Sequence, residues 1–300
     1  MFKILNFFTK FLLGTGFEKI PGVTSIYRRI FKLLKPTGMI LINCQGNKMY
    51  VNTEDTGVAS QLLAGMEYEP FETELVKKLL KKNMSVVNIG ANIGYYTLIA
   101  ANSVGPNGKV YAFEPEPKNF KLLVRNIKKN DFKNILPIQA AVSDKKGTLK
   151  LFLDKSNLAA PSLAEQNTSK KNGFVEVETN SLDNFLEKYN KGFNVDLIQI
   201  DAQGSEGLIL AGAKKIIGNH NLKIIMEFWP YGLHNMGTNA LDLLKRIESY
   251  GFEIGLIDET NKCISYLQPE KIVEMCKNSK NGMHYVNLLL EKSNQYTVQF

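Results

Sequence analysis

Residues 88–97, with the sequence Asn-Ile-Gly-Ala-Asn-Ile-Gly-Tyr-Tyr-Thr, have the composition of a turn that holds a nucleotide-like ligand. This segment joins an apolar run at 84–87 to a helix-like run at 98–103. Glycines at positions 90 and 94 let the backbone bend sharply and approach a ligand, and the start of a helix presents N–H groups without partners in the helix. Because a Gly-x-x-x-Gly spacing is also common in helix packing and in loops, further residues must support this interpretation.

An acidic residue follows the glycine turn at the separation that ribose recognition requires. Glu114 ends the apolar run 109–114, about twenty residues after the turn, where a carboxylate accepts hydrogen bonds from both hydroxyls of a ribose. Pro115 then fixes the following loop, and Phe113 or Phe120 is available to cover an adenine ring. The turn and the acid together indicate a nucleotide-like cofactor.

Polar side chains also end the other strand-like runs. Ser143-Asp144, Asp201 and Glu227 follow the third, fourth and fifth of these runs. Since the carboxyl ends of parallel strands meet at one edge of a sheet, where ligands bind, we expect these side chains to lie near Glu114.

The spacing of apolar residues predicts an open α/β sandwich, because strand-like runs alternate with amphipathic helical segments. The expected strands are 84–90, 109–114, 135–141, 195–201, 222–228, 252–258 and 284–291. The expected helices between them are 95–103, 118–129, 205–217 and 239–250. A polar segment at 154–172, between strand-like runs at 149–153 and 174–178, breaks the pattern and predicts a long surface loop.

The composition is that of a globular protein with a large core, since 44% of the 300 residues are hydrophobic. Cys44, Cys263 and Cys276 are scattered, so they predict neither a disulfide framework nor a zinc site, and a reducing cytoplasm fits best. The net charge of +8 lies mostly in residues 1–36, which carry seven basic side chains and one acid, a balance of 7 − 1 = +6. With only four arginines in the chain, binding to nucleic acid is not expected.

The basic segment 1–36 contains two amphipathic, aromatic stretches, at 1–13 and 23–35. Both are too short for a spanning helix, and the first lacks the features of a signal peptide. Basic amphipathic helices lie in anionic membrane surfaces, so this arm is a candidate for contact with the inner face of a membrane. The alternative is that it packs on the core or on a second subunit, and the oligomeric state is not indicated.

Taken together, these features resemble the FkbM-type methyltransferases, within the class I S-adenosylmethionine-dependent methyltransferases. The resemblance covers roughly 60–230 and rests on ordered blocks at 68–73, 88–97, 110–117, 126–130, 198–206 and 210–213. It implies a Rossmann-like, seven-stranded, mostly parallel sheet with its last strand antiparallel. It also implies bound S-adenosylmethionine and methylation of an oxygen, often on a sugar or a polyketide-like molecule.

The cofactor-binding residues expected on this basis come from the turn and from the strand ends. They are Asn88, Gly90, Ala91, Asn92, Gly94, Tyr95, Glu114, Pro115, Ser143, Asp144 and Asp201. The family usually has Asp, Lys and Glu where this chain has Asn88, Gln199 and Gln203, so three charges are replaced by amides. Asn88 is expected to hydrogen-bond near the amino acid end of the cofactor. Gln199 and Gln203 lose opposite charges, which would preserve the local balance.

Methyl transfer to a hydroxyl group needs alignment of the two groups and a base that takes the proton. The candidates lie at or just after the ends of the fourth and fifth strands, and they are Asp201, Glu206, Glu227 and His234. Asp201 is the first choice, although it could instead bond to the Gln203-Gly204 turn, and Glu206 could instead cap the next helix. No spacing of His and Asp residues requires a metal ion.

The regions expected from these observations are a basic helical arm at 1–36, a hairpin and helix cap at 37–80, and an S-adenosylmethionine-binding methyltransferase domain at 81–300. The cap would contain strands at 39–43 and 48–51 and a helix at 72–81. Trp229-Pro230-Tyr231 offers an aromatic surface for a sugar ring, with packing under the C-terminal helix as the alternative.

The sequence therefore predicts an O-methyltransferase that acts on a glycan or a small hydroxylated molecule. An RNA methyltransferase is the second hypothesis. A membrane-peripheral protein that binds the cofactor without catalysis is the third, because of the three amides and the basic arm. A nicotinamide dehydrogenase is disfavoured, since Gly-x-Gly-x-x-Gly and a Tyr-x-x-x-Lys pair are both absent.

Overall fold

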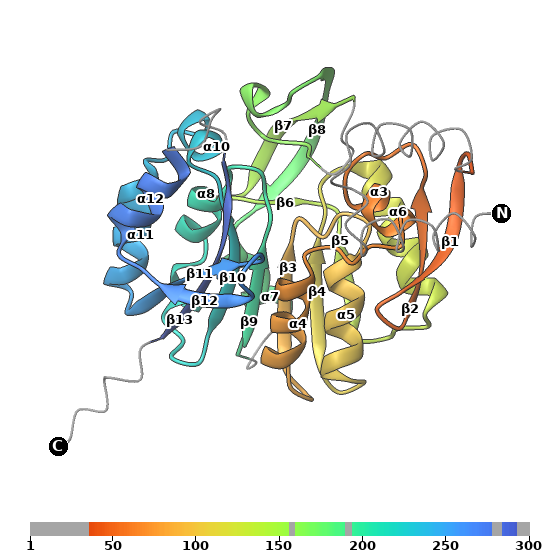
Figure 1. Ribbon diagram of the computed structural model, residues 1–300, viewed down its shortest axis with the longest axis horizontal. Coiled ribbons are helices and arrows are strands. Elements are labelled where there is room, and N and C mark those ends of the chain that lie inside the picture. The colour runs from red at the N-terminus through yellow and green to blue at the C-terminus, as the bar shows by residue number, and fades with distance from the viewer. Residues whose placement is uncertain (1–35, 156–159, 190–193, 278–283, 293–300) are drawn as a thin grey trace.

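The computed structural model describes residues 36–155, 160–189, 194–277 and 284–292 (Figure 1). The predicted basic arm at 1–36 therefore lies outside the described residues, apart from its last residue. Among the helices that are described, none is long and apolar enough to cross a membrane.

The central element is a sheet of eight strands in the order β12-β11-β13-β10-β9-β3-β4-β5. The strands are β3 (Ser85–Ile89), β4 (Lys109–Phe113), β5 (Ile135–Ile138), β9 (Leu197–Ile200), β10 (Lys223–Phe228), β11 (Phe252–Asp258), β12 (Cys263–Tyr266) and β13 (Val286–Lys292). Neighbouring strands from β10 to β5 are parallel, and β13 lies antiparallel between β10 and β11. The seven predicted strands and the antiparallel last strand are confirmed.

The eighth strand, β12, was not predicted. It pairs antiparallel with β11 at the outer edge of the sheet and covers only four residues, which are exposed or half-buried. A strand this short and this exposed has no distinctive apolar pattern, so only its pairing defines it.

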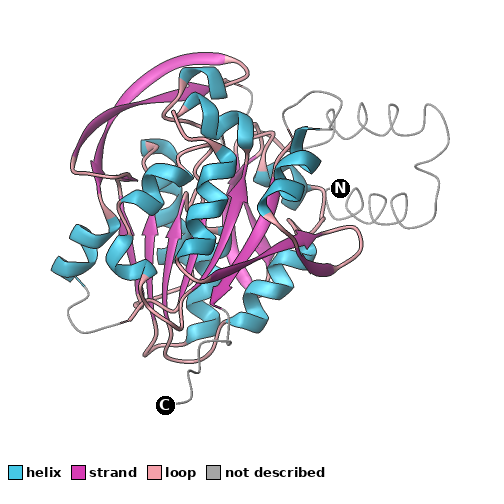
Figure 2. Ribbon diagram, turned by 90° about the vertical axis from the view of Figure 1, so that its left-hand side faces the viewer, coloured by secondary structure: helices cyan, strands magenta, loops and turns pink. Residues whose placement is uncertain are grey.

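Helices cover both faces of the sheet (Figures 1 and 2). One face carries α3 (Val58–Leu63), α4 (Pro70–Leu79), α5 (Tyr95–Val104) and α6 (Pro117–Lys129). The other carries α7 (Leu182–Tyr189), α8 (Glu206–Ala211), α9 (Lys214–Ile217), α11 (Ala240–Ser249) and α12 (Pro269–Lys277). Val86 packs into the first of these cores while Val87 and Ile89 pack into the second, because successive side chains of a strand point to opposite faces.

The predicted helix at 205–217 is two helices, α8 and α9, separated at Gly212. A Cβ atom at Gly212 would lie 2.1 Å from the carbonyl oxygen of Ser143. The chain therefore passes so close to a neighbouring loop that only glycine fits, and the helix is interrupted there.

The predicted strand 135–141 also divides. After β5 the chain leaves the main sheet and forms β6 (Ala141–Val142), which pairs in parallel with β8 (Lys171–Asn180). β7 (Gly147–Asp154) pairs antiparallel with β8, so the two predicted strand-like runs are confirmed as parts of longer strands. Figure 2 shows this small sheet curving away from the main one.

The segment predicted as a surface loop at 154–172 folds back onto the main sheet instead, in the part that is described. Ser162 bridges to Phe152, and Ser162 and Asn167 are buried. The Ser162 hydroxyl and the Asn167 amide both donate hydrogen bonds to the carbonyl oxygen of Gln203, at 2.8 and 2.9 Å. These bonds satisfy a carbonyl in a turn after β9, which is why a polar segment is buried here.

Ahead of the main sheet, β1 (Met39–Cys44) and β2 (Asn47–Asn52) form the predicted hairpin. The hairpin packs on α6, where the Asn126 side chain accepts from the backbone N–H of Tyr50 at 2.7 Å and donates to its carbonyl at 3.1 Å. The next helix, α3, was not predicted, and α4 begins at Pro70 rather than at 72.

Candidate active site

The carboxyl ends of β3, β4 and β9 are tied together by backbone hydrogen bonds. The N–H groups of Gly90 and Ala91 both donate to the carbonyl of Phe113, at 3.0 and 2.9 Å, and the N–H of Asp201 donates to Ile89 at 3.0 Å. A Cβ atom at Gly90, where φ is +79°, would lie 1.8 Å from the carbonyl oxygen of Asp201. The glycine is thus required by the contact between the turn and the end of β9.

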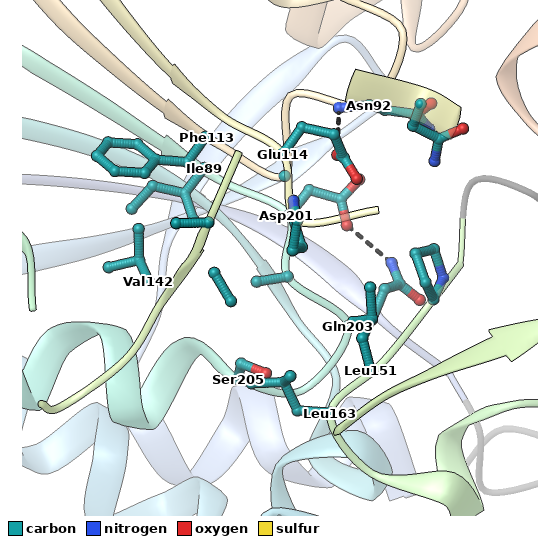
Figure 3. A pocket seen from close by; sticks show the side chains of 17 residues that line it. Ile89, Asn92, Phe113, Glu114, Val142, Leu151, Leu163, Asp201, Gln203 and Ser205 are labelled. Carbon is teal, nitrogen blue, oxygen red and sulfur yellow. Dashed lines mark hydrogen bonds between the residues drawn. The ribbon is translucent and has the colours of Figure 1, made fainter. Parts of the chain in front are cut away.

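A first cavity, of about 50 Å³, lies against this turn (Figure 3). Its polar lining includes Gly90, Asn92, Glu114, Asp201 and Ser205. Its apolar walls are Ile89, Phe113, Pro115, Val142, Leu151 and Leu163. The combination of a carboxylate at one end and apolar walls beyond it suits a nucleoside, whose ribose is polar and whose base is flat and apolar on its faces.

Glu114 is held in place by the backbone on both sides. Its two carboxyl oxygens accept hydrogen bonds from the N–H groups of Asn92, at 2.7 Å, and Glu116, at 2.9 Å. Burial raises the pKa of Glu114 to about 8. The remaining lone pairs of this carboxyl group are free to accept from ribose hydroxyls, which fits the role that the sequence predicts.

Ser205 provides a second polar group in the first cavity. Its side chain is 3% exposed, and its hydroxyl has no hydrogen-bond partner among the described residues. Figure 3 shows it with Leu163 at the end of the cavity away from Glu114. An unpartnered buried hydroxyl is costly, so a group of the bound nucleoside is well suited to satisfy it.

A second cavity, of about 380 Å³, adjoins the first and shares Asp201 and Gln203 with it. Its remaining lining residues are Thr56, Gly57, Val58, Gln61, Tyr68, Ala160, Glu227, Trp229 and Tyr285. The sequence indicated Asp201, Glu227 and Trp229, but not the residues between 56 and 68 or Tyr285. Those residues come from segments far apart in the chain, and only Tyr68 belongs to a block that resembles the family.

Gln203 joins the two acids that face the second cavity. Its side-chain amide donates to Asp201 at 2.7 Å and to Glu227 at 3.1 Å. Gln203 has φ of +50° and the following Gly204 has φ of +99°, where a Cβ atom would lie 2.6 Å from the backbone of Gly232. This tight turn directs the amide between the two carboxyl groups, so one neutral side chain holds both.

Six carboxyl groups with raised pKa values gather at this edge of the sheet. They are Glu69, Glu72, Glu114, Asp201, Glu206 and Glu227. Burial is the largest cause for each, and it raises the pKa of Glu69 and of Glu206 to about 7. The Asp201 carboxylate raises the pKa of Glu227 further. In the part of the chain that the structure describes, no Lys, Arg or His forms an ion pair with any of the six.

The sequence model of the Methyltransferase FkbM domain matches residues 88–254, which is more than half of the chain. This protein belongs to the FkbM methyltransferase family. The methyltransferase sdnD of Sordaria araneosa is 27% identical over 203 residues, which are 58% of this chain and 76% of sdnD.

Among solved structures, this FkbM-family methyltransferase is similar to a methyltransferase FkbM from Methylobacillus flagellatus KT. That structure is 15% identical with a TM-score of 0.40, and the match covers 78% of this chain and 52% of the other. TYW2 of M. jannaschii, solved in complex with AdoMet, is 15% identical with a TM-score of 0.44, and the match covers 86% and 89% of the two chains.

Not every residue predicted to bind the cofactor in this FkbM-family methyltransferase lies on the first cavity. Gly90, Asn92, Glu114, Pro115 and Asp201 line it. Ala91, Gly94, Tyr95, Ser143 and Asp144 do not, and neither does Asn88. Gly94 instead meets Leu123, which a Cβ atom would approach to 2.8 Å, and Asp144 is an exposed residue that accepts from the Ser143 hydroxyl.

Two of these residues have well-defined partners inside the protein. Asn88 is buried, accepts from the Thr97 hydroxyl at 2.6 Å and donates to Gln199 at 3.1 Å. Both ends of its amide are therefore used beneath the turn. The hydroxyl of Tyr95 contacts that of Thr73 at 3.1 Å and donates to the carbonyl of Tyr68 at 3.2 Å, so Tyr95 supports a residue that lines the second cavity.

Gln199 and Gln203 have different hydrogen-bond partners. Gln199 accepts from Asn88 and donates to Glu72 at 3.4 Å, whereas Gln203 donates to Asp201 and Glu227. The balance of charge expected between the two amides stays a prediction.

Two of the predicted bases lie away from both cavities. His234 is an exposed residue of α10 (Pro230–Asn235) and lines neither of them. Glu206 is fully buried and accepts from the N–H groups of Ala202 and Gly204, each at 3.2 Å. These hydrogen bonds stabilise the turn after β9. Of the four predicted bases, Asp201 and Glu227 line the second cavity.

Proposed function

We propose that this protein is an S-adenosylmethionine-dependent O-methyltransferase that acts on a sugar or a small hydroxylated molecule. The observation that carries this proposal is the contact between the two cavities through Asp201 and Gln203. A cofactor in the first cavity and an acceptor in the second would meet beside these residues. That arrangement provides the alignment on which methyl transfer depends.

The residues of the first cavity fit the cofactor. Glu114 would accept hydrogen bonds from the ribose hydroxyls, and Phe113 and Val142 would enclose the base. The backbone at Gly90 would lie next to the rest of the cofactor. When bound, S-adenosylmethionine supplies an electrophilic methyl group on a positively charged sulfur. Burial raises the pKa values of Glu114 and Asp201, and a cationic cofactor beside them would favour their ionised forms.

Asp201 or Glu227 would take the proton of the acceptor hydroxyl. Both line the second cavity, and burial raises the pKa of each, which makes their carboxylates stronger bases than exposed ones. The rings of Tyr68, Trp229 and Tyr285 offer apolar faces on which a sugar ring packs. Among the residues that the structure describes, no Lys, Arg or His lines this cavity, which disfavours the phosphodiester backbone of RNA as the group beside the cofactor.

The cofactor site is tested with Glu114→Ala and with Glu178→Ala, a matched change of an exposed glutamate on β8. Calorimetry with S-adenosylhomocysteine should show an affinity loss of about a hundredfold or more for the first variant, because both ribose hydroxyls lose the carboxyl group that accepts from them. Glu178→Ala should bind normally. Equal affinities of the two variants, with equal melting temperatures, would show that the cofactor lies elsewhere.

The reaction itself is tested by incubating the full chain with methyl-labelled S-adenosylmethionine and a panel of sugars and hydroxylated small molecules. Mass spectrometry should locate the label on an oxygen. Label on nitrogen or carbon would contradict O-methylation, and bound cofactor without any transfer would favour a binding protein that lacks catalysis.

A further inference from the structure

The second cavity has an unusual combination of charge and aromatic surface. Asp201 and Glu227 supply carboxyl groups, and Tyr68, Trp229 and Tyr285 supply rings. None of the described residues that line it is basic. A cavity of this kind repels carboxylated and phosphorylated molecules, because their charge would meet acids that no cation compensates.

The acids also influence two tyrosines that line the cavity, Tyr68 and Tyr285. Burial, and then the carboxylates of Glu227, Glu69 and Asp201, raise the pKa of Tyr285 to about 12. Burial together with Glu69 and Asp201 also raises the pKa of Tyr68. The negative charge of the acids therefore acts on both Tyr68, which precedes α4, and Tyr285, which precedes β13. A cationic group bound in this cavity would reduce the repulsion among its carboxylates.

Trp229 adds a third aromatic side chain to the lining of this cavity, beside Asp201 and Glu227. Carboxyl groups attract a cation, and the faces of aromatic rings also attract one. The cavity thus combines two kinds of group that bind a cation.

We propose that the acceptor is an amino-hydroxyl compound, such as an amino sugar. Its positively charged amino group would have the carboxyl groups of Asp201 and Glu227 on one side and the aromatic rings on the other. This inference rests on the proposed function, because it concerns the acceptor of that reaction. It narrows the acceptor from hydroxylated molecules in general to those that carry an ammonium group.

The test uses three related sugars that differ in charge: glucosamine, which is cationic, N-acetylglucosamine, which is neutral, and glucuronate, which is anionic. Their binding to the full chain saturated with S-adenosylhomocysteine is measured by saturation-transfer NMR and calorimetry. Glucosamine should bind about tenfold more tightly than N-acetylglucosamine, because its ammonium group would pair with two carboxyl groups that contribute about threefold each, and glucuronate should bind least.

The preference should depend on Glu227. In Glu227→Gln the ratio between glucosamine and N-acetylglucosamine should fall to about threefold or less, as expected when one of two counter-charges is removed. Glu253→Gln, an exposed glutamate of β11, serves as the matched control and should keep the full ratio. Affinity for S-adenosylhomocysteine, measured in the same samples, reports whether each variant is folded.

The outcomes separate the two proposals. Absence of S-adenosylhomocysteine binding would overturn the proposed function. Normal S-adenosylhomocysteine binding overturns the amino-acceptor inference alone if glucosamine fails to bind, if it binds no better than N-acetylglucosamine, or if its preference survives in Glu227→Gln.

Discussion

Gly90 is the residue at which a single added methyl group should do most damage to the site. In Gly90→Ala the new Cβ atom would lie 1.8 Å from the carbonyl oxygen of Asp201. Real Cβ contacts are not shorter than 3.0 Å, so the two segments must separate by at least 3.0 − 1.8 = 1.2 Å. The oxygen that the new Cβ atom would meet belongs to the backbone of Asp201. This backbone cannot move freely, because the Asp201 N–H donates a hydrogen bond to Ile89 in β3.

The cost has two parts. The positive φ of +79° costs a non-glycine residue about 1 kcal/mol, and the forced separation adds about 1–3 kcal/mol of overpacking. Gly173→Ala is a matched control, because Gly173 has φ of +76° and nothing within 4 Å of its Cβ position. The free energy of unfolding of the control should therefore fall only by the cost of the positive φ.

The free energy of unfolding, measured in urea, should fall by about 2–4 kcal/mol in Gly90→Ala and by about 1 kcal/mol in Gly173→Ala. Calorimetry should also show weakened binding of S-adenosylhomocysteine in Gly90→Ala alone, since Asp201 lines both cavities. Equal destabilisation of the two variants would refute the steric argument and leave only backbone strain.

Three further predictions concern the acids and the N-terminal segment. Gln203→Glu replaces the donor between Asp201 and Glu227 with a third acid, so carbon-detected NMR titration should show the pKa values of both neighbours moving upward; unchanged or lower values would contradict the bridge. Stability without cofactor should fall as pH rises from about 4.5 through 8, because the raised pKa values of Glu114 and Glu206 mean that the folded state holds protons more tightly than the unfolded state. Urea unfolding at pH 5.5 and 8.5 measures this, and greater stability at 8.5 would refute it. Deletion of residues 1–35, which hold the predicted basic arm, should abolish flotation with vesicles of anionic lipid and leave S-adenosylhomocysteine affinity unchanged; flotation that persists would place the membrane contact elsewhere.

Local patterns were enough to identify seven of the eight strands of the main sheet. The strands β3, β4, β9 and β10 are short and mostly apolar, with a polar residue in or next to the last positions, namely Asn88, Glu114, Asp201 and Glu227. This pattern follows from burial on both faces and a ligand-binding edge at the carboxyl ends. The glycine turn and Glu114 were recognisable for the same reason, because their spacing is set by one strand, one turn and one crossover. The break at Gly212 was not recognisable, because it depends on the carbonyl of Ser143 in a distant segment. β12 was missed for another reason, since this strand is short and its residues are exposed or half-buried.

The sequence by itself determined the family, the order of the parallel strands along the chain and the position of Glu114 after β4, because each depends on residues that are close in sequence. Only the tertiary structure decided which acids face a cavity. It separated Asp201 and Glu227 from Glu206 and His234, and it brought Tyr68 and Tyr285 beside them. The physical reason is that orientation and burial at the sheet edge depend on contacts between segments more than a hundred residues apart, which no local spacing encodes.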